Sequence, residues 1–182
     1  MIKRLFFLMM ALACLGGCEN DMETIRKLNS GIEAQTETGD DIEMLYSTEA
    51  HVRARLVSPQ LKRYSVKQSC MEFEKGLVVY FYDDSMNQTS RLTANYGRVD
   101  EGSNDMLVRD KVEVVNTKNE TLHTEELIWN NKTRRITSDK FVKIQTADEI
   151  IYGDGLDANE DMTNYRIKKI SGTVKLKNAP TP

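Results

Sequence analysis

The side chains that most often perform catalysis are scarce in this chain and do not form a recognisable set. The two histidines, His51 and His123, each stand beside charged residues in an alternating apolar and polar stretch. A histidine in such a stretch is typical of a solvated strand face. The sequence offers neither a Cys/His spacing that suits zinc nor a Ser-His-Asp arrangement. We therefore predict a protein that is not an enzyme and that uses no metal ion or cofactor.

Two short polar motifs have simpler interpretations than ligand binding. Gly153-Asp154-Gly155 is too short for a phosphate loop and is typical of a bend or bulge in a strand. The acidic side chains of Asp154, Asp157, Glu160 and Asp161 lack the spacing of an EF-hand, which favours a solvated turn. Both motifs are predicted to shape the backbone.

The strongest chemical signal lies at the N-terminus. Lys3 and Arg4 precede an apolar run over residues 5–14, and Leu15-Gly16-Gly17-Cys18 follows. The run is shorter than the ~20 apolar residues of a spanning helix and is typical of a secretory signal. The final tetrapeptide resembles the bacterial lipobox, whose cysteine is lipidated before cleavage. We predict that residues 1–17 are a lipoprotein signal peptide and that Cys18 carries a lipid anchor on the periplasmic side of a membrane. The alternative is a plain signal peptide with a chance cysteine.

Charge and cysteine content restrict the partners of the mature protein. Residues 1–17 hold two basic and no acidic residues, so the chain's 25 basic and 28 acidic residues leave a mature net charge of −5. This charge argues against nucleic acid and against a polybasic contact with a membrane. With Cys14 removed and Cys18 lipidated, Cys70 has no partner for an intrachain disulfide. We expect Cys70 to pack as a small buried apolar residue.

The rest of the chain divides by its hydrophobic pattern. Residues 18–45 are polar and mixed in charge, which indicates a tether with weak helical tendency; a flexible coil of ~25 residues would span about 25 to 30 Å. Residues 46–177 alternate with a period of two and are predicted to form one β domain, followed by a tail over residues 178–182. Residues 77–82 are apolar on both faces, which suggests a strand covered on both sides.

Polar turns separate these alternating runs, at residues 83–85, 101–104, 116–120 and 130–132. The fold class is therefore all-β, with many short antiparallel strands. Within it, a strand pair recurs about every thirty residues, and each pair must stack on its neighbours to bury its apolar face. Chance alignment of ordinary β alternation is the alternative. The first strands of the units contain Leu92, Leu122 and Ile151, and the second strands contain Val112, Val142 and Val174.

Between about residues 45 and 176 the chain resembles the LptC family, the periplasmic component of lipopolysaccharide export. The resemblance is carried by residues 91–97, 108–116, 121–129, 135–139 and 151–158, which include Ile136-Thr137-Ser138-Asp139 and Tyr152-Gly153-Asp154-Gly155-Leu156. These motifs are specific in combination. Many family members have an uncleaved N-terminal membrane helix, whereas this chain has a lipobox, so the resemblance does not imply a role that depends on such a helix.

The resemblance implies a β-jellyroll: a twisted, V-shaped pair of antiparallel sheets with an apolar trough open along one side and at both ends. It implies a protein at the inner membrane that receives lipopolysaccharide from the inner-membrane export ABC transporter and passes it to a downstream periplasmic jellyroll protein. Each candidate trough residue could equally be ordinary core. The candidates are Leu56, Phe73, Val79, Phe81, Leu92, Val112, Val114, Leu122, Leu127, Trp129, Ile136, Val142, Ile144, Ile151 and Leu156.

Two other function classes stay open from the residues alone. A lipid-anchored binding or assembly module of the cell envelope would place exposed aromatic side chains in loops, yet Tyr80 and Trp129 fall in strand patterns. A lipid-anchored hydrolase would need a buried polar constellation.

At the C-terminal end, residues 173–177 form a strand whose lysines and following prolines suit ordinary edge protection. The resemblance instead implies that this edge joins the sheet of the downstream partner, while residues 46–56 face the transporter.

Overall fold

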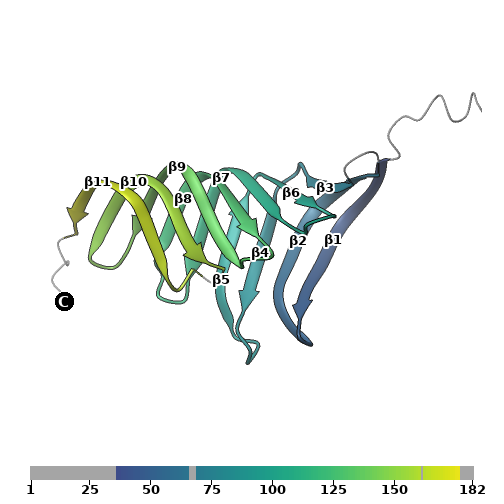
Figure 1. Ribbon diagram of the computed structural model, residues 1–182, viewed down its shortest axis with the longest axis horizontal. Coiled ribbons are helices and arrows are strands. Elements are labelled where there is room, and N and C mark those ends of the chain that lie inside the picture. Colours follow the sequence, from purple (N-terminus) through teal and green to yellow (C-terminus); the bar gives the residue numbers. More distant parts are fainter. Residues whose placement is uncertain (1–35, 66–68, 161, 177–182) are drawn as a thin grey trace, which may run out of the picture. The chain divides into compact units, whose positions relative to one another are not determined.

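The computed structural model describes residues 36–65, 69–160 and 162–176. These residues form eleven strands in one antiparallel sheet, and no helix that could span a membrane occurs among them (Figure 1). The all-β prediction is confirmed for this part of the chain. The strands are β1 (Thr36–Thr48), β2 (His51–Tyr64), β3 (Cys70–Phe73), β4 (Leu77–Tyr82), β5 (Gln88–Ala94), β6 (Tyr96–Asp100), β7 (Met106–Asn116), β8 (Thr121–Asn130), β9 (Arg135–Gln145), β10 (Glu149–Asn159) and β11 (Tyr165–Lys175).

The sheet is a meander in which successive long strands pair with each other. β3 and β4 together pair with β5 and β6 as one interrupted hairpin, since Cys70 lies opposite Asp100 and Leu77 lies opposite Ala94. β1 and β11 lie at opposite ends of the sheet, in purple and yellow in Figure 1. If β3 with β4 and β5 with β6 are each counted as one interrupted strand, the order of strands in space follows their order in the sequence.

A line of backbone irregularities crosses the middle of the strands. The register shifts at Asp110 and Lys111 in β7, which have φ values of 67° and 56°, and again at Gly155 in β10, where φ is 78°. Gly76, with φ of 83°, breaks the strand between β3 and β4. Extra residues bend a strand and increase its twist. The bends allow one sheet to fold over itself, so that side chains from both halves of the strands join a single hydrophobic core.

The alternation predicted from the sequence decides which side chains enter this core. In β4, Leu77, Val79 and Phe81 are buried, whereas the intervening residues are half-buried. The prediction that residues 77–82 are covered on both faces is therefore wrong in part, because only the inner face is buried and the outer face is shielded just partly, by neighbouring side chains. The Arg55 guanidinium, for example, lies 4.7 Å from the centre of the Tyr80 ring.

The predicted strand pairs are neighbours in the sheet. Leu92 lies opposite Val114 in the β5–β7 pair, and Leu122 lies opposite Ile144 in the β8–β9 pair. The third pair has the same register, since Ile151 lies opposite Thr173, and in all three pairs the partner lies 22 residues further along the chain. The repeat is thus confirmed as a succession of strand pairs with one common register, and the predicted place of Val174 in the third unit is wrong by three residues.

The predicted boundary between tether and domain is wrong. β1 begins at Thr36, so residues 36–45 form a strand that pairs with β2 along its length. Ile42, Met44 and Tyr46 alternate with polar or exposed residues, which is the pattern of a half-buried strand. Cys70 is buried, as predicted. The signal peptide, Cys18, residues 19–35 and the predicted tail at 178–182 lie outside the described residues.

Candidate functional site

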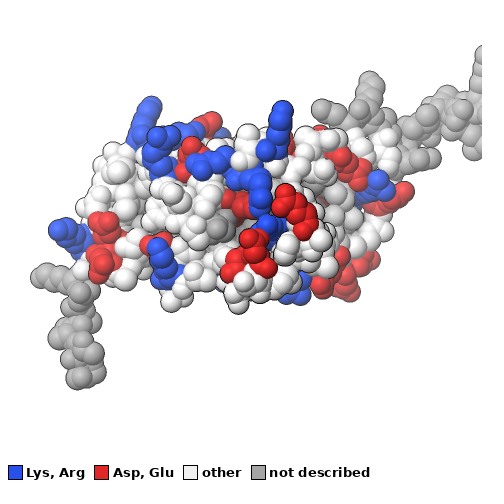
Figure 2. Space-filling model, turned by 60° about the horizontal axis from the view of Figure 1, so that its bottom comes forward, with Lys and Arg blue, Asp and Glu red and all other residues white. Residues whose placement is uncertain are grey.

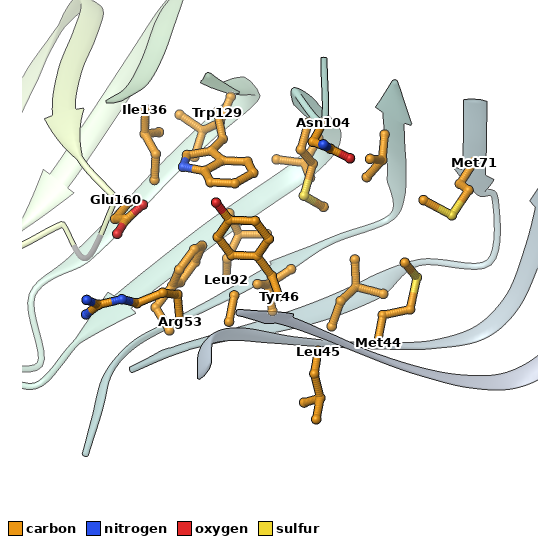
Figure 3. A pocket seen from close by; sticks show the side chains of 18 residues that line it. Met44, Leu45, Tyr46, Arg53, Met71, Leu92, Asn104, Trp129, Ile136 and Glu160 are labelled. Carbon is orange, nitrogen blue, oxygen red and sulfur yellow. The ribbon is translucent and has the colours of Figure 1, made fainter. Parts of the chain in front are cut away.

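An apolar cavity of about 260 Å³ lies between the two folded halves of the sheet (Figure 3). An apolar cavity of roughly 150 Å³ already holds a molecule of benzene. This cavity is therefore large enough for part of an organic ligand. It is lined by Met44, Leu45, Tyr46, Arg53, Ala54, Leu56, Met71, Val79, Phe81, Leu92, Val99, Asn104, Met106, Val108, Leu127, Trp129, Ile136 and Glu160.

The apolar residues that line the cavity are those that strand alternation directs inward. Ala54 and Leu56 are inward-facing residues of β2, and Met44 is the inward residue of β1 that pairs with Leu56. Met71 and Met106 join Met44 in the wall from β3 and β7. Methionine is unbranched and has a polarisable sulfur, so it adapts to ligands of irregular shape. The wall can thus adjust to flexible apolar chains.

Two aromatic rings connect β1 with β8 across the cavity. The rings of Tyr46 and Trp129 meet edge to face with their centres 5.3 Å apart. The Tyr46 hydroxyl donates a hydrogen bond of 2.7 Å to Asn131 Oδ1 and accepts one of 3.0 Å from Thr48 Oγ1. Figure 3 shows Tyr46 directly facing Trp129. This contact joins two strands that are not neighbours in the sheet, so it closes the cavity on that side.

Charged side chains border the same cavity. Arg53 is left without a counterpart where the β1–β2 register shifts, because Tyr46 pairs with Ala54 and Ser47 pairs with Val52. Its guanidinium forms an ion pair with Asp84 in the β4–β5 turn. Glu160 accepts hydrogen bonds from Arg134, one of them 3.0 Å long from Nε, and this contact raises the pKa of the Arg134 guanidinium. The cavity is therefore apolar in its interior and charged at its border.

The predicted trough residues divide between this cavity and the packed core. Seven line the cavity: Leu56, Val79, Phe81, Leu92, Leu127, Trp129 and Ile136. Phe73, Val112, Val142 and Leu156 are buried in the core and are not part of its wall, and Ile151 is only half-buried. The structure thus brings about half of the predicted set around one cavity.

The remaining three predicted residues, Val114, Leu122 and Ile144, line a second cavity of only about 10 Å³. Met162 and Tyr165, from the connection after β10 and the start of β11, fill the space beside them. Burial in this region raises the pKa of the Tyr165 phenol. The predicted trough is therefore wide beside β1 and β2 and nearly closed beside Met162 and Tyr165.

Sequence reasoning missed several residues of the large cavity, above all Met44 and Tyr46 of β1. The alternation of Ile42, Met44 and Tyr46 was a usable signal, but the polar composition of residues 18–45 assigned the first two to the tether, and Tyr46, though placed in the β domain, was not named as a candidate. Arg53 was not among the candidates, because the register shift beside it in the β1–β2 pair has no local sequence signature. Met71 and Met106 follow ordinary strand alternation, so nothing in their own sequence context separates a cavity wall from a filled core.

The histidines and acidic residues weighed in the sequence as catalytic or metal-binding candidates contact neighbouring strands and turns. His123 Nδ1 lies 3.7 Å from Glu113 across two strands, and His51 Nδ1 lies 2.9 Å from the Glu49 carbonyl oxygen. Asp157 pairs with Arg135 at 2.5 Å. Among the described residues, no group of three or more His, Cys, Asp or Glu side chains could hold a metal ion. Acidic and basic side chains lie next to one another over much of the face in Figure 2, as expected for exposed ion pairs.

Comparison with protein families adds an independent observation. Residues 8–174 match the family model described as LptC, lipopolysaccharide-assembly, LptC-related. A search of curated proteins found no match. The family has the β-jellyroll fold and comprises transport-related binding proteins rather than enzymes, which act in lipopolysaccharide transport with the Lpt transporter and bridge proteins at the periplasmic side of the inner membrane. The match covers most of the chain, and the antiparallel sheet that folds over itself agrees with it. The chain belongs to the LptC-related family of lipopolysaccharide-assembly proteins.

Proposed function

We propose that the protein binds lipopolysaccharide through its acyl chains in the large cavity and passes it to the next periplasmic jellyroll protein, without catalysing a reaction. The observation that carries this proposal is the apolar cavity between the halves of the sheet. Burial of one methylene group contributes about 0.8 kcal/mol. A chain of several methylenes therefore gains enough free energy to leave water for the cavity, and it can leave again for a similar surface.

The anchor on Cys18 would keep the domain near the inner-membrane ABC transporter from which the lipid arrives. The lipobox supports this part of the proposal. Replacing Cys18 with Ala should release the protein in soluble form, because the folded part of the chain has its own hydrophobic core. Fractionation after a salt wash measures the release. A Cys18→Ala protein that stays with the membrane would contradict lipid anchoring.

Transfer to a downstream jellyroll protein would use the free edge of β11. β11 pairs with β10 on one side only among the described strands, and its Ile170 and Val174 side chains are 65% and 52% exposed. Edge strands with free backbone groups can accept a strand from a partner. We propose that the partner's sheet continues from β11 and that the opposite edge, at β1, faces the transporter.

Lipid capture in living cells tests the binding step. A photo-crosslinking amino acid at Phe81, which lines the cavity, should capture lipopolysaccharide. The matched control is the same amino acid at Tyr80, which is adjacent in β4 but lies on the outer face under Arg55. Equal capture at positions 80 and 81 would indicate adsorption to the surface and would contradict binding in the cavity.

A proline substitution tests the transfer step. The Leu176 N–H donates to the Asp148 carbonyl oxygen, and successive residues of a strand direct their N–H groups to opposite sides. The Lys175 N–H therefore faces the free edge. Lys175→Pro should remove that donor and abolish crosslinking to the downstream protein, while the contact with the transporter persists. Lys175→Ala, which keeps the N–H, is the control. Loss of both contacts, or of neither, would contradict transfer at this edge.

A further inference from the structure

Two hydrogen-bond donors in the wall of the large cavity have no acceptor among the described residues. They are Nε1 of the Trp129 indole and Nε of the Arg53 guanidinium, and both atoms are buried. A buried donor without an acceptor costs about 1 to 3 kcal/mol. Such donors are expected where a ligand supplies the acceptor.

The two donors lie toward one end of the cavity. In Figure 3 the Arg53 guanidinium, the Trp129 nitrogen and the Glu160 carboxylate lie toward one side of the view, whereas Met44 and Met71 lie toward the other. Arg53 is held by Asp84, and Trp129 is held by the edge-to-face contact with Tyr46. The cavity therefore has a polar end whose donors are fixed by neighbouring groups and an apolar end walled by flexible side chains.

From this asymmetry we infer that the cavity binds an acyl chain in one direction, with the ester or amide carbonyl that begins the chain at the Arg53 and Trp129 end and the methyl terminus toward Met44 and Met71. This inference rests on the proposed function and adds to it the ligand group that is recognised. A carbonyl oxygen at this end can accept a hydrogen bond from either donor. A plain alkyl chain would leave both donors unpaired, so the site distinguishes acylated molecules from other amphiphiles.

Two detergents with equal chain length and similar sugar heads test the inference. Decanoyl sucrose has an ester carbonyl at the start of its ten-carbon chain, and decyl maltoside has an ether oxygen there. Calorimetry with the mature protein, below the critical micelle concentration of each detergent, should show that decanoyl sucrose binds about tenfold more tightly, as expected for one or two additional hydrogen bonds. Trp129 is the only tryptophan of the chain, so its fluorescence should also change when either detergent binds.

Variants identify the donors that create this preference. Trp129→Phe keeps an aromatic ring but removes the N–H, and Arg53→Met keeps an apolar stem but removes Nε. Each should reduce the tenfold preference several-fold, and the double variant should bind both detergents equally. Arg55→Met is the control, because Arg55 packs over the Tyr80 ring and does not line the cavity. Near-ultraviolet circular dichroism checks that each variant is folded.

The outcomes separate the inference from the function on which it rests. Equal affinity of the wild-type protein for both detergents, or an unchanged preference in the double variant, would overturn the directional site and leave lipid binding intact. Failure of both detergents to bind would overturn the proposed function as well.

Discussion

Two parts of the core are built by equivalent strand pairs yet differ in how completely they are filled. Leu92 in the β5–β7 pair faces a cavity of about 260 Å³, whereas Leu122, at the same position of the β8–β9 pair, lines one of about 10 Å³. Both side chains are buried, with 4% and 3% of their surface exposed. Burial alone therefore does not distinguish the wall of a cavity from a close-packed core.

The difference comes from the side chains that arrive from distant parts of the chain. Met162 and Tyr165 fill the space beside Leu122, and Met162 does so with a φ of 57°, which turns the chain sharply before β11. Beside Leu92, the flexible Met44 and Met106 stand in the wall instead. One part of the core is thus closed by a turn of the backbone and the other can be filled by a ligand.

The largest expected effect compares truncations at the two equivalent leucines. Leu122→Ala should lower the free energy of unfolding by about 4 kcal/mol, because close-packed neighbours cannot collapse into the space. Leu92→Ala should cost about 2 to 3 kcal/mol, near the lower limit for such changes, since one side of Leu92 already faces a cavity. Urea denaturation measures both values. Equal costs would contradict the distinction between the two parts of the core.

The next prediction compares substitutions that add side-chain volume in the closed core and in the large cavity. Ala158 is fully buried, and Ala158→Phe should destabilise the protein by about 3 kcal/mol or more through overpacking. Ala54 lines the large cavity, so Ala54→Phe should change stability by less than about 1 kcal/mol. The same Ala54→Phe variant should lose at least about tenfold in affinity for decanoyl sucrose, because the ring occupies the space of the chain. A stable Ala54→Phe protein with unchanged affinity would place the ligand elsewhere.

A smaller effect concerns the contact that closes the large cavity. Tyr46→Phe removes the hydrogen bond to Asn131 but keeps the edge-to-face contact with Trp129. We expect a loss of about 1 kcal/mol in stability and faster binding of decanoyl sucrose, measured by stopped-flow Trp129 fluorescence. Tyr152→Phe, which keeps the stacked contact with Phe141 away from the cavity, is the control. Unchanged binding rates in Tyr46→Phe would show that this hydrogen bond does not restrict access.

The last prediction concerns the pH dependence of stability in the closed part of the core, which appears only at alkaline pH. Burial raises the pKa of Tyr165 in the folded protein, so the neutral phenol is favoured by folding. Its contribution is complete below the ordinary tyrosine pKa of about 10 and is lost as the pH rises through the higher folded value. Tyr165→Phe should therefore lose less stability between pH 9 and pH 11 than the wild-type protein, by urea denaturation at roughly those pH values. Tyr96, whose pKa burial raises to about 12, remains in both proteins. An equal loss in both would contradict burial of the Tyr165 phenol.

Local sequence patterns predicted much of this fold because each depends on near neighbours. The alternation of Val112 and Val114 with Glu113 and the pattern around Leu122 predicted strands with the correct inward face, and Gly153-Asp154-Gly155 predicted the bulge at Gly155. The start of β1 was missed because strand pairing outweighs the polar composition of residues 36–45. The partner of Ile151 was missed because Thr173, which lies opposite it, is polar, whereas Val174 and Leu176 repeat the expected apolar alternation three residues further along.

The sequence by itself determined the all-β class, most of the alternating strands between residues 46 and 177 and the family, since these follow from side-chain period, polar turns and characteristic motifs. Only the tertiary structure decided which buried residues face a cavity. That depends on whether a side chain distant in sequence, such as Met162, occupies the space opposite them. The register shift that turns Arg53 toward the cavity is likewise a property of two paired strands. No single strand can specify it, because both alternatives present the same local alternation.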